Sequence, residues 1–197
     1  MAQGKQAKIL TVKQEAFILH HLTTTRYPLR DRAMFLLSMK AGLRAKEMAA
    51  LTWSMVTEAD GQVGETLHLV NAASKGETGG RSIPLHRDLR TVLVELAQAQ
   101  RARRDLDRPV LRSERGGGLS AASVQGWFQR LYETLELAGC SSHSGRRTFI
   151  TRAARKVSEV GGSLRDVQQL AGHSSLATTQ RYIEGDTDAK RKLIQML

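Results

Sequence analysis

The sequence predicts a mainly α-helical domain with one small antiparallel β-sheet. Apolar residues recur at helical spacing along most of the chain, and only two short segments, 67–70 and 81–85, are candidates for strands. The segment between them, 71–80, is rich in Gly, Ser and Lys, which is typical of an exposed hairpin loop. With 197 residues, of which 41% are hydrophobic, the chain is long enough for one domain with a sizeable core.

Capping signals place the helices along the chain. Thr11 and Gln14 form a capping box at the start of the first helix, and Ser163 and Asp166 form another near the end of the chain. Gly42 marks the point where the second helix stops. We expect helices over residues 11–21, 31–40, 45–51, 86–103, 120–137, 143–156, 164–171 and 176–183.

The charge balance favours a polyanionic partner. The chain has 30 Lys and Arg against 19 Asp and Glu, a net charge of +11, which is most simply explained by nucleic acid. Aromatic residues make up only 5% of the chain, which argues against a platform that stacks bases. No apolar run approaches the ~18 residues that span a bilayer, and the start of the sequence has no apolar signal core. The lone Cys140 fits a reducing compartment, so we expect a cytoplasmic protein.

A set of basic, imidazole and phenol side chains stands out as able to act on a phosphate. Taken singly, each has a structural explanation, such as a solvated charge at a helix end or a partly buried aromatic ring. His143 and Arg146 are three residues apart, so they share one face of a helix. The candidate catalytic residues are Arg44, Lys75, His143, Arg146, His173 and Tyr182.

Four segments closely resemble the tyrosine recombinase (phage integrase) family. They are AGLRAKEMAALTW, SKGETGGRSIPL, SSHSGRRTFITRAA and LAGHSSLATTQRYIEGD. The family signature has an Arg in G-L-R-x-x-E, a hairpin Lys, an H-x-x-R helix, an L-G-H turn and a Tyr nine residues after that His. Tyr182 lies nine residues after His173, and Glu47 falls where the first segment expects it. The resemblance covers residues 11–183 and implies the fold of a recombinase catalytic domain.

Two positions depart from the family pattern. Gly145 stands where H-x-L-R has its Leu, and Ala171 stands where L-L-G-H has its second Leu. Neither change removes a polar group, so both should affect local packing more than chemistry.

Attack on a phosphodiester builds negative charge on its non-bridging oxygens. Arg44 and Arg146 could clamp those oxygens with paired N–H donors, while the two histidines donate hydrogen bonds or handle protons near neutral pH. A phenol needs a base or electrostatic help to attack at pH 7, and His143 is our candidate for that base. The resemblance implies that Lys75 protonates the leaving 5′-oxygen and that Tyr182 forms a covalent 3′-phosphotyrosine.

The sequence shows no Walker loop, no H-E-x-x-H, no paired Cys and no acidic cluster suited to two metal ions. We therefore expect metal-independent strand exchange without a cofactor. The resemblance implies double-stranded DNA as substrate, a homotetramer on two DNA sites, and the possible help of DNA-bending proteins. Phosphate contacts are expected from the basic side chains of the helix that follows His143, namely Arg147, Arg152, Arg155 and Lys156.

We divide the chain into a basic tail (1–10), a catalytic domain (11–185) and a C-terminal tail (186–197) that either docks into a neighbouring subunit or folds onto its own core. The chain could be part of a longer enzyme, or a short member like the fimbrial phase-switch invertases. Two alternatives to a recombinase stay open at this point. One is a DNA-binding regulator derived from a recombinase, and the other is a type IB topoisomerase-like enzyme.

Overall fold

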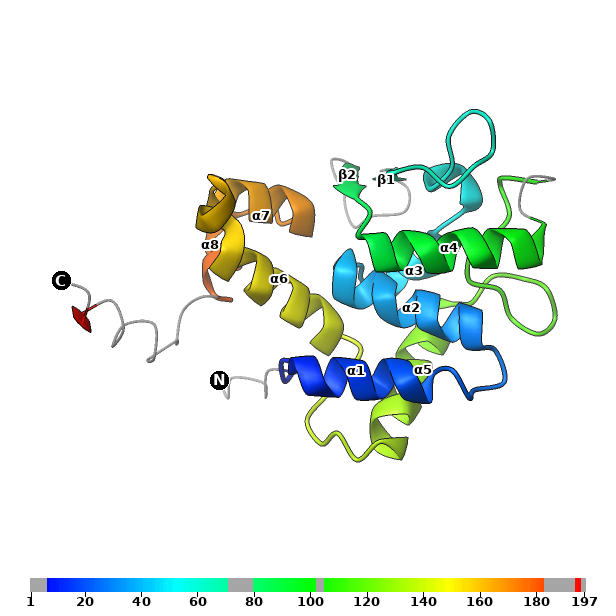
Figure 1. The fold of residues 1–197 in the computed structure, drawn as a ribbon, viewed down its shortest axis with the longest axis horizontal. Helices are drawn as coiled ribbons and strands as arrows, with labels where there is room; N and C mark the ends of the chain where they lie inside the picture. Colours follow the sequence, from blue (N-terminus) through cyan, green and yellow to red (C-terminus); the bar gives the residue numbers. More distant parts are fainter. Residues whose placement is uncertain (1–6, 71–79, 102–104, 183–193, 196–197) are drawn as a thin grey trace.

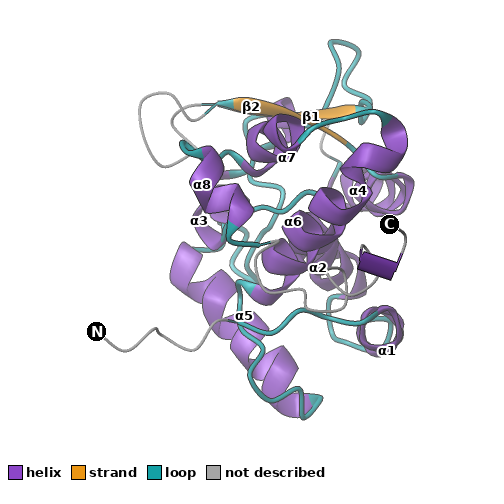
Figure 2. Ribbon diagram, turned by 90° about the vertical axis from the view of Figure 1, so that its left-hand side faces the viewer, coloured by secondary structure: helices purple, strands orange, loops and turns teal. Residues whose placement is uncertain are grey.

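The described part of the chain is mostly helical, with a two-stranded sheet at one edge (Figures 1 and 2). A computed structural model describes residues 7–70, 80–101, 105–182 and 194–195. Strands β1 (Thr66–Leu69) and β2 (Arg81–Pro84) pair antiparallel, with Leu67 opposite Ile83. The helical elements are α1 (Val12–His21), α2 (Pro28–Lys40), α3 (Ala45–Ala50), η1 (Trp53–Met55), α4 (Arg87–Gln100), α5 (Ala121–Thr134), α6 (Ser144–Lys156), η4 (Val157–Val160), α7 (Leu164–Ala171) and α8 (Leu176–Gln180).

The predicted fold class is confirmed, and the differences lie at the ends of helices and strands. Helix α2 begins at Pro28 instead of residue 31, because proline fits the first turn of a helix, where its missing N–H is not needed. Helix α4 ends at Gln100, where Arg101 turns into the left-handed region with φ of 53°. Helix α8 was expected to extend through residue 183 but ends at Gln180, so Tyr182 lies in the turn that follows it rather than on the helix.

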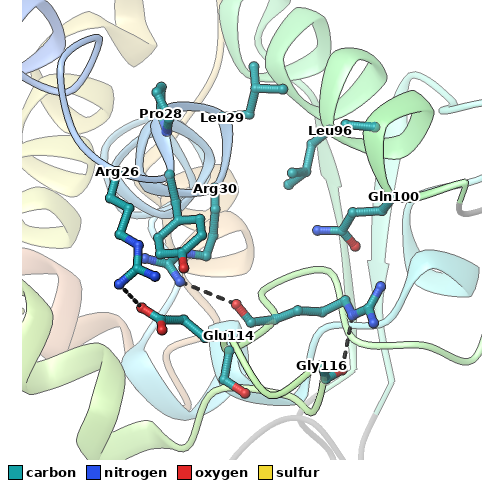
Figure 3. A pocket seen from close by; sticks show the side chains of 12 residues that line it. Arg26, Pro28, Leu29, Arg30, Leu96, Gln100, Glu114 and Gly116 are labelled. Atoms are coloured by element: carbon teal, nitrogen blue, oxygen red, sulfur yellow. Dashed lines mark hydrogen bonds and ion pairs between the residues drawn. The ribbon is translucent and has the colours of Figure 1, made fainter.

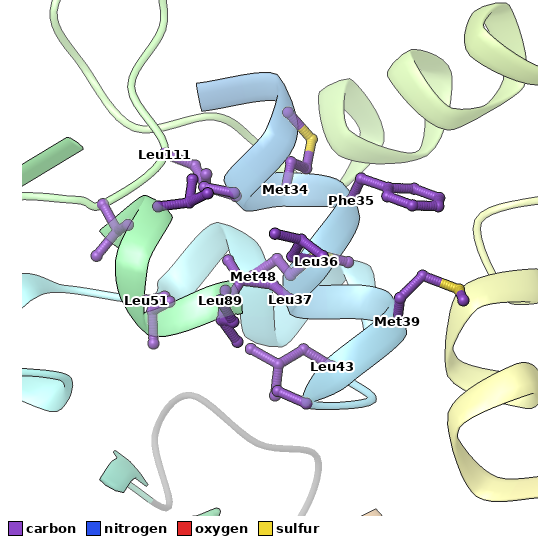
Figure 4. Close-up of a cluster of buried hydrophobic side chains, with 14 of the residues drawn as sticks. Met34, Phe35, Leu36, Leu37, Met39, Leu43, Met48, Leu51, Leu89 and Leu111 are labelled. Carbon is purple, nitrogen blue, oxygen red and sulfur yellow. The ribbon is translucent and has the colours of Figure 1, made fainter. Parts of the chain in front are cut away.

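Helix α2 forms the centre of the main core. Every residue from Ala33 to Met39 is buried, and the side chains of Met34, Phe35 and Leu37 leave the helix in different directions (Figure 4). A helix that is covered on all sides has no polar face, and its sequence therefore shows little amphipathic pattern. Helices α4 and α6 pack against α2.

A second, smaller apolar cluster joins α6 to α7. It consists of Ile150, Val167 and Ala171, with Phe149 and the ring of Tyr182 packed against it. Figure 1 shows α6, α7 and α8 together on one side of the molecule, next to the end of α2. The loop between α2 and α3 meets this group where Phe149 packs over Gly42, whose φ is +63°.

Gly145 is required by the close crossing of α2 and α6. A Cβ atom on Gly145 would lie 2.3 Å from Oγ of Ser38 and 3.3 Å from the backbone carbonyl carbon of the same residue. Leucine, which the family pattern has here, would not fit without moving one helix. The departure noted in the sequence is thus matched by a small residue, Ser38, on the facing helix.

The described start of the chain is attached to the body of the domain. Leu10 is 1% exposed, and its backbone N–H donates to Oγ1 of Thr148. The buried carboxylate of Glu15 on α1 pairs with Lys40 of α2 and with Arg152 of α6. These contacts join α1, α2 and α6. No helix in the described ranges is both long enough and apolar enough to cross a membrane.

Candidate active site

Five of the six predicted catalytic residues line one cavity. Its volume is about 530 Å³, and it opens between the start of α6, the start of α3 and the segment that follows α7. The sixth residue, Lys75, falls in 71–79, outside the described residues. The cavity is lined by Arg44, His143, Arg146, His173 and Tyr182, together with Ala7, Ser141, Arg147, Thr178 and Arg181.

Arg146 is the most deeply buried cation of the site, with 4% of its surface exposed. Its Nη1 donates to the carbonyl oxygen of Gly42 at 2.5 Å, and its Nη2 donates to that of Ala171 at 2.6 Å. Burial, followed by the charge of Arg44, lowers the pKa of Arg146 to about 10, so the guanidinium is still charged at pH 7. The two carbonyls hold this charge in place at the floor of the cavity.

Arg44 precedes α3 and is held by a buried carboxylate. Its Nη1 donates to Oε1 of Glu47 at 2.8 Å, and its backbone N–H donates to Oε2 of the same side chain at 2.8 Å. Its Nη2 donates to the carbonyl oxygen of Gly172 at 3.2 Å. About a third of the Arg44 side chain is exposed, so it remains accessible from the cavity. The spacing G-L-R-x-x-E therefore has a local cause, because Glu47 caps the helix that Arg44 begins.

The carboxylate of Glu47 also pairs with Arg81, which comes from β2. Nη1 and Nη2 of Arg81 donate to Oε1 and Oε2 of Glu47 at 2.9 and 3.0 Å. Burial opposes the charge of Glu47, but its hydrogen bonds to Arg81 and Arg44 outweigh that effect and lower the pKa of Glu47. Glu47 thus stays ionised, although its side chain is only 1% exposed.

Three arginines cap the C-terminal end of α7. The last carbonyls of a helix lack partners within the helix, and that end carries partial negative charge. Here the carbonyl of Leu170 accepts from Nε of Arg81, that of Ala171 accepts from Arg146, and that of Gly172 accepts from Arg44. One helix end therefore gathers three guanidiniums from three different parts of the chain, with the single carboxylate of Glu47 among them. The surplus positive charge suits an anion.

His173 follows this helix end directly. Gly172 adopts a φ of 60° and turns the chain, and Nδ1 of His173 lies 2.9 Å from Oγ1 of the fully buried Thr179. Burial, followed by the charges of Arg146, Arg44 and Arg81, lowers the pKa of His173 to about 4. The imidazole is therefore neutral at pH 7 in the absence of an anion.

Tyr182 and His143 complete the cavity from two sides. The ring of Tyr182 stacks on that of His173, with centroids 5.6 Å apart and an angle of 22° between the planes. His143 is the residue before α6, three positions ahead of Arg146. The phenol thus lies in the same cavity as the two arginines that were predicted to bind the phosphate.

Two basic side chains of α6 have different roles, because one lines the cavity and the other pairs with α1. Arg147 lines the cavity and donates from Nη1 to the carbonyl oxygen of Ala7. Arg152, which we expected to bind phosphate, instead pairs with Glu15 and with the carbonyl oxygen of Leu10. Its charge is used to hold α1 against α6, so a phosphate would have to compete with Glu15 for Arg152.

Sequence reasoning missed Arg81 and Thr179. Arg81 lies two residues before Ile83 on β2, so both side chains are on the same face of the strand, and Ile83 is buried. An arginine on the inward face of a strand needs a buried partner. The alternation of residues along this strand could therefore have identified Arg81 from the sequence. Thr179 had no comparable signal, because its hydroxyl meets His173 only after the chain turns at Gly172.

The fold and the cavity together define the class of protein, a mainly helical domain with four arginines, two histidines and a tyrosine around one cavity. The chain belongs to the phage integrase family, which matches residues 8–188. Its fold is that of a tyrosine recombinase catalytic domain.

Curated relatives are tyrosine recombinases of the XerC type. The chain is 30% identical over 193 residues to XerC of Herpetosiphon aurantiacus, covering 95% of this chain and 59% of the relative. It is 29% identical over 185 residues to XerC of Xylella fastidiosa strain 9a5c, covering 94% and 58%. The chain thus spans about three-fifths of the length of these relatives.

Solved structures with the same fold include an integrase and a recombinase. The Tn1549 transposon integrase, in complex with transposon right end DNA, matches with a TM-score of 0.75 at 17% identity, covering 100% of this chain and 68% of that one. The XerA recombinase matches with a TM-score of 0.72 at 21% identity, covering 95% and 64%.

Proposed function

We propose that this chain is the catalytic domain of a site-specific DNA recombinase, which cleaves and rejoins DNA through a covalent 3′-phosphotyrosine. The observation that carries the proposal is the single cavity that Arg44, Arg146 and Tyr182 line together. Two guanidiniums held on opposite sides of the molecule could not clamp one phosphate, whereas these two donate to the carbonyls of consecutive residues, Gly172 and Ala171.

The scissile phosphate would bind between the two arginines. Each guanidinium carries five N–H donors, and the contacts with carbonyls and Glu47 use only some of those of Arg44 and Arg146. Donors that are fixed before the substrate arrives stabilise the extra charge of the transition state without reorganisation. Neutral His173, with Nδ1 at Thr179, has Nε2 left for a phosphate oxygen.

In the cleavage step, Oη of Tyr182 forms a bond to phosphorus, and the bond from phosphorus to the 5′-oxygen breaks. The phenol proton passes to a base, for which His143 in the same cavity is our candidate. The departing 5′-oxygen takes a proton, and Lys75 is our candidate for the donor. Religation reverses these transfers when a 5′-hydroxyl attacks the phosphotyrosine, so the bond energy is conserved and no nucleotide cofactor is consumed.

Duplex DNA is the proposed partner, and the basic composition of the chain, with a net charge of +11, supports it. We further propose a homotetramer on two DNA sites, with accessory bending proteins where the site needs them. XerH is a relative whose solved structure is a complex with its difH substrate. The catalytic domain would comprise residues 11–185, and the tail 186–197 would contact a neighbouring subunit. We propose that the enzyme acts in the cytoplasm, where bacterial DNA is found.

Covalent trapping tests the proposal. The probe is a pool of nicked duplex oligonucleotides with a randomised recognition segment, in which the fragment beyond the nick diffuses away after cleavage. We expect an SDS-resistant protein–DNA adduct, with mass spectrometry placing the nucleotide on Tyr182. The adduct should be lost in Tyr182→Phe, whose ring still stacks on His173. Tight DNA binding without any adduct would indicate the regulator instead. An adduct without strand exchange between two selected sites would indicate a topoisomerase-like enzyme.

A further inference from the structure

Arg81 is buried at the back of the catalytic cavity and does not line it. Its side chain is 7% exposed, and its hydrogen bonds go to both oxygens of Glu47 and to the carbonyl oxygen of Leu170. A buried guanidinium with a paired, bidentate carboxylate is held in one orientation. Arg81 is therefore not placed to contact a substrate in the cavity. Its partners, Glu47 and the Leu170 carbonyl, lie next to Arg44 and His173, which do line the cavity.

Two paths lead from Arg81 to the cavity. The first runs through Glu47, whose Oε1 accepts from both Arg81 and Arg44, so that the carboxylate fixes one guanidinium relative to the other. The second runs through the end of α7, where Arg81 binds the Leu170 carbonyl three residues before His173. Arg81 also packs against Gly172, because a Cβ atom there would lie 2.6 Å from its Nη1.

We propose that Arg81 is a positioning residue of the recombinase site, which fixes Arg44 through Glu47 and fixes the turn bearing His173 through the end of α7. This inference rests on the proposed function for its effect on cleavage, but its effect on geometry is independent of that function. Arg81 is also the first residue of β2, so it ties the sheet to the cavity.

The test compares Arg81→Lys and Arg81→Gln. Lysine keeps the charge but loses the planar fork, and glutamine loses both, so neither can hold Glu47 at both oxygens. We expect both variants to form the Tyr182 adduct about 10- to 100-fold more slowly at saturating protein. DNA affinity should be unchanged, because Arg81 is buried and does not line the cavity.

A second readout follows the histidine ring by NMR. The charges near His173 are Arg146, Arg44, Arg81 and Glu47. Removing one positive charge should raise the pKa of His173 in Arg81→Gln, whereas Arg81→Lys should stay closer to the wild-type value of about 4. A residue that only stabilised the fold would lower the melting temperature and leave the cleavage rate of the remaining folded protein unchanged.

Arg30, near the start of α2, provides a matched control, because it is a mostly buried arginine that also pairs with a carboxylate. It pairs with the buried Asp31, its side chain is 16% exposed, and its Nη1 donates to the carbonyl oxygen of Arg112. It lines a separate cavity of about 390 Å³ that contains none of the predicted catalytic residues (Figure 3). Arg30→Lys and Arg30→Gln should lower the melting temperature but keep the cleavage rate and the pKa of His173.

The outcomes separate this inference from the proposed function. If the wild-type chain forms no adduct, the recombinase proposal fails, while the NMR shifts of the His173 ring in Arg81→Lys, which keeps the charge, still test whether Arg81 fixes the His173 turn. If the wild type cleaves, and both Arg81 variants cleave at its rate with an unchanged His173 pKa, Arg81 has no positioning role.

Discussion

The rings of His173 and Tyr182 lie stacked, with their centroids 5.6 Å apart. The same short stretch of chain carries Thr179, whose hydroxyl oxygen lies 2.9 Å from Nδ1 of His173. The segment that carries Tyr182, the proposed nucleophile, thus makes two contacts with one histidine. We infer that the position of His173 and that of Tyr182 depend on each other.

Thr179→Val should slow cleavage by about tenfold or more, because an orienting hydrogen bond is lost at a reacting centre. Valine keeps the shape but leaves the imidazole nitrogen without its partner, which costs about 1–3 kcal/mol of stability. Single-turnover trapping and thermal unfolding measure the two effects. Thr91→Val on α4 is the control, since Thr91 donates only to the carbonyl of Arg87. Equal cleavage rates in both variants would show that the Thr179 contact is dispensable.

The pKa of His173 should be near 4 in the free protein and should rise when an anion binds. Burial and the neighbouring arginines lower this pKa, and inorganic phosphate would neutralise part of the arginine charge. An NMR titration of the ring with and without phosphate measures the change. The same titration in Arg146→Gln, which has lost one of those charges, should begin at a higher pKa. A pKa that does not respond to phosphate would contradict an anion site here.

The depressed pKa of His173 also predicts a pH dependence of stability. The unfolded chain binds a proton at His173 near its ordinary pKa of about 6.5, before the folded chain does. This contribution to stability is therefore fully present above that pH and is lost as the pH falls towards 4. Denaturant unfolding across this range should show the loss, and His173→Gln should make the decline shallower. An identical decline in both proteins would mean that other groups cause it.

Gly145→Leu should destabilise the protein by about 1–3 kcal/mol, because the larger residue forces α2 and α6 apart. The smaller change Gly145→Ala places a Cβ atom 2.3 Å from Oγ of Ser38. Ser38→Gly should recover part of the stability lost in Gly145→Ala, which a double-mutant cycle of unfolding free energies would detect as coupling. Strict additivity of the two substitutions would mean that the Ser38 side chain does not cause the cost of Gly145→Ala.

Cleavage should be unaffected by EDTA. In the proposed mechanism, the guanidiniums of Arg44 and Arg146 would provide the charge that a metal ion could otherwise supply at the phosphate. Adduct formation after extensive dialysis against the chelator, with and without added Mg²⁺, measures this. A rate that depends on Mg²⁺ would show that the arginines alone do not carry the transition-state charge.

The sequence by itself determined the fold class and most of the site. Capping boxes act between neighbours in the chain, so they can be recognised without a structure. The two that we predicted, Thr11 with Gln14 and Ser163 with Asp166, were both confirmed. The family motifs pointed to five residues that the cavity brings together. Local spacing also explains Glu47, which accepts from the backbone N–H of Arg44 three residues earlier.

Only the tertiary structure decided how these residues are held. The end of α7 collects Arg44, Arg81 and Arg146 from distant segments, because unpaired carbonyls and buried guanidiniums satisfy each other there. Long-range packing also decided three other features. They are the turn that carries Tyr182, the close approach of Gly145 to Ser38 and the pairing of Arg152 with Glu15. Each depends on partners that are far apart in the chain, and no local pattern records them.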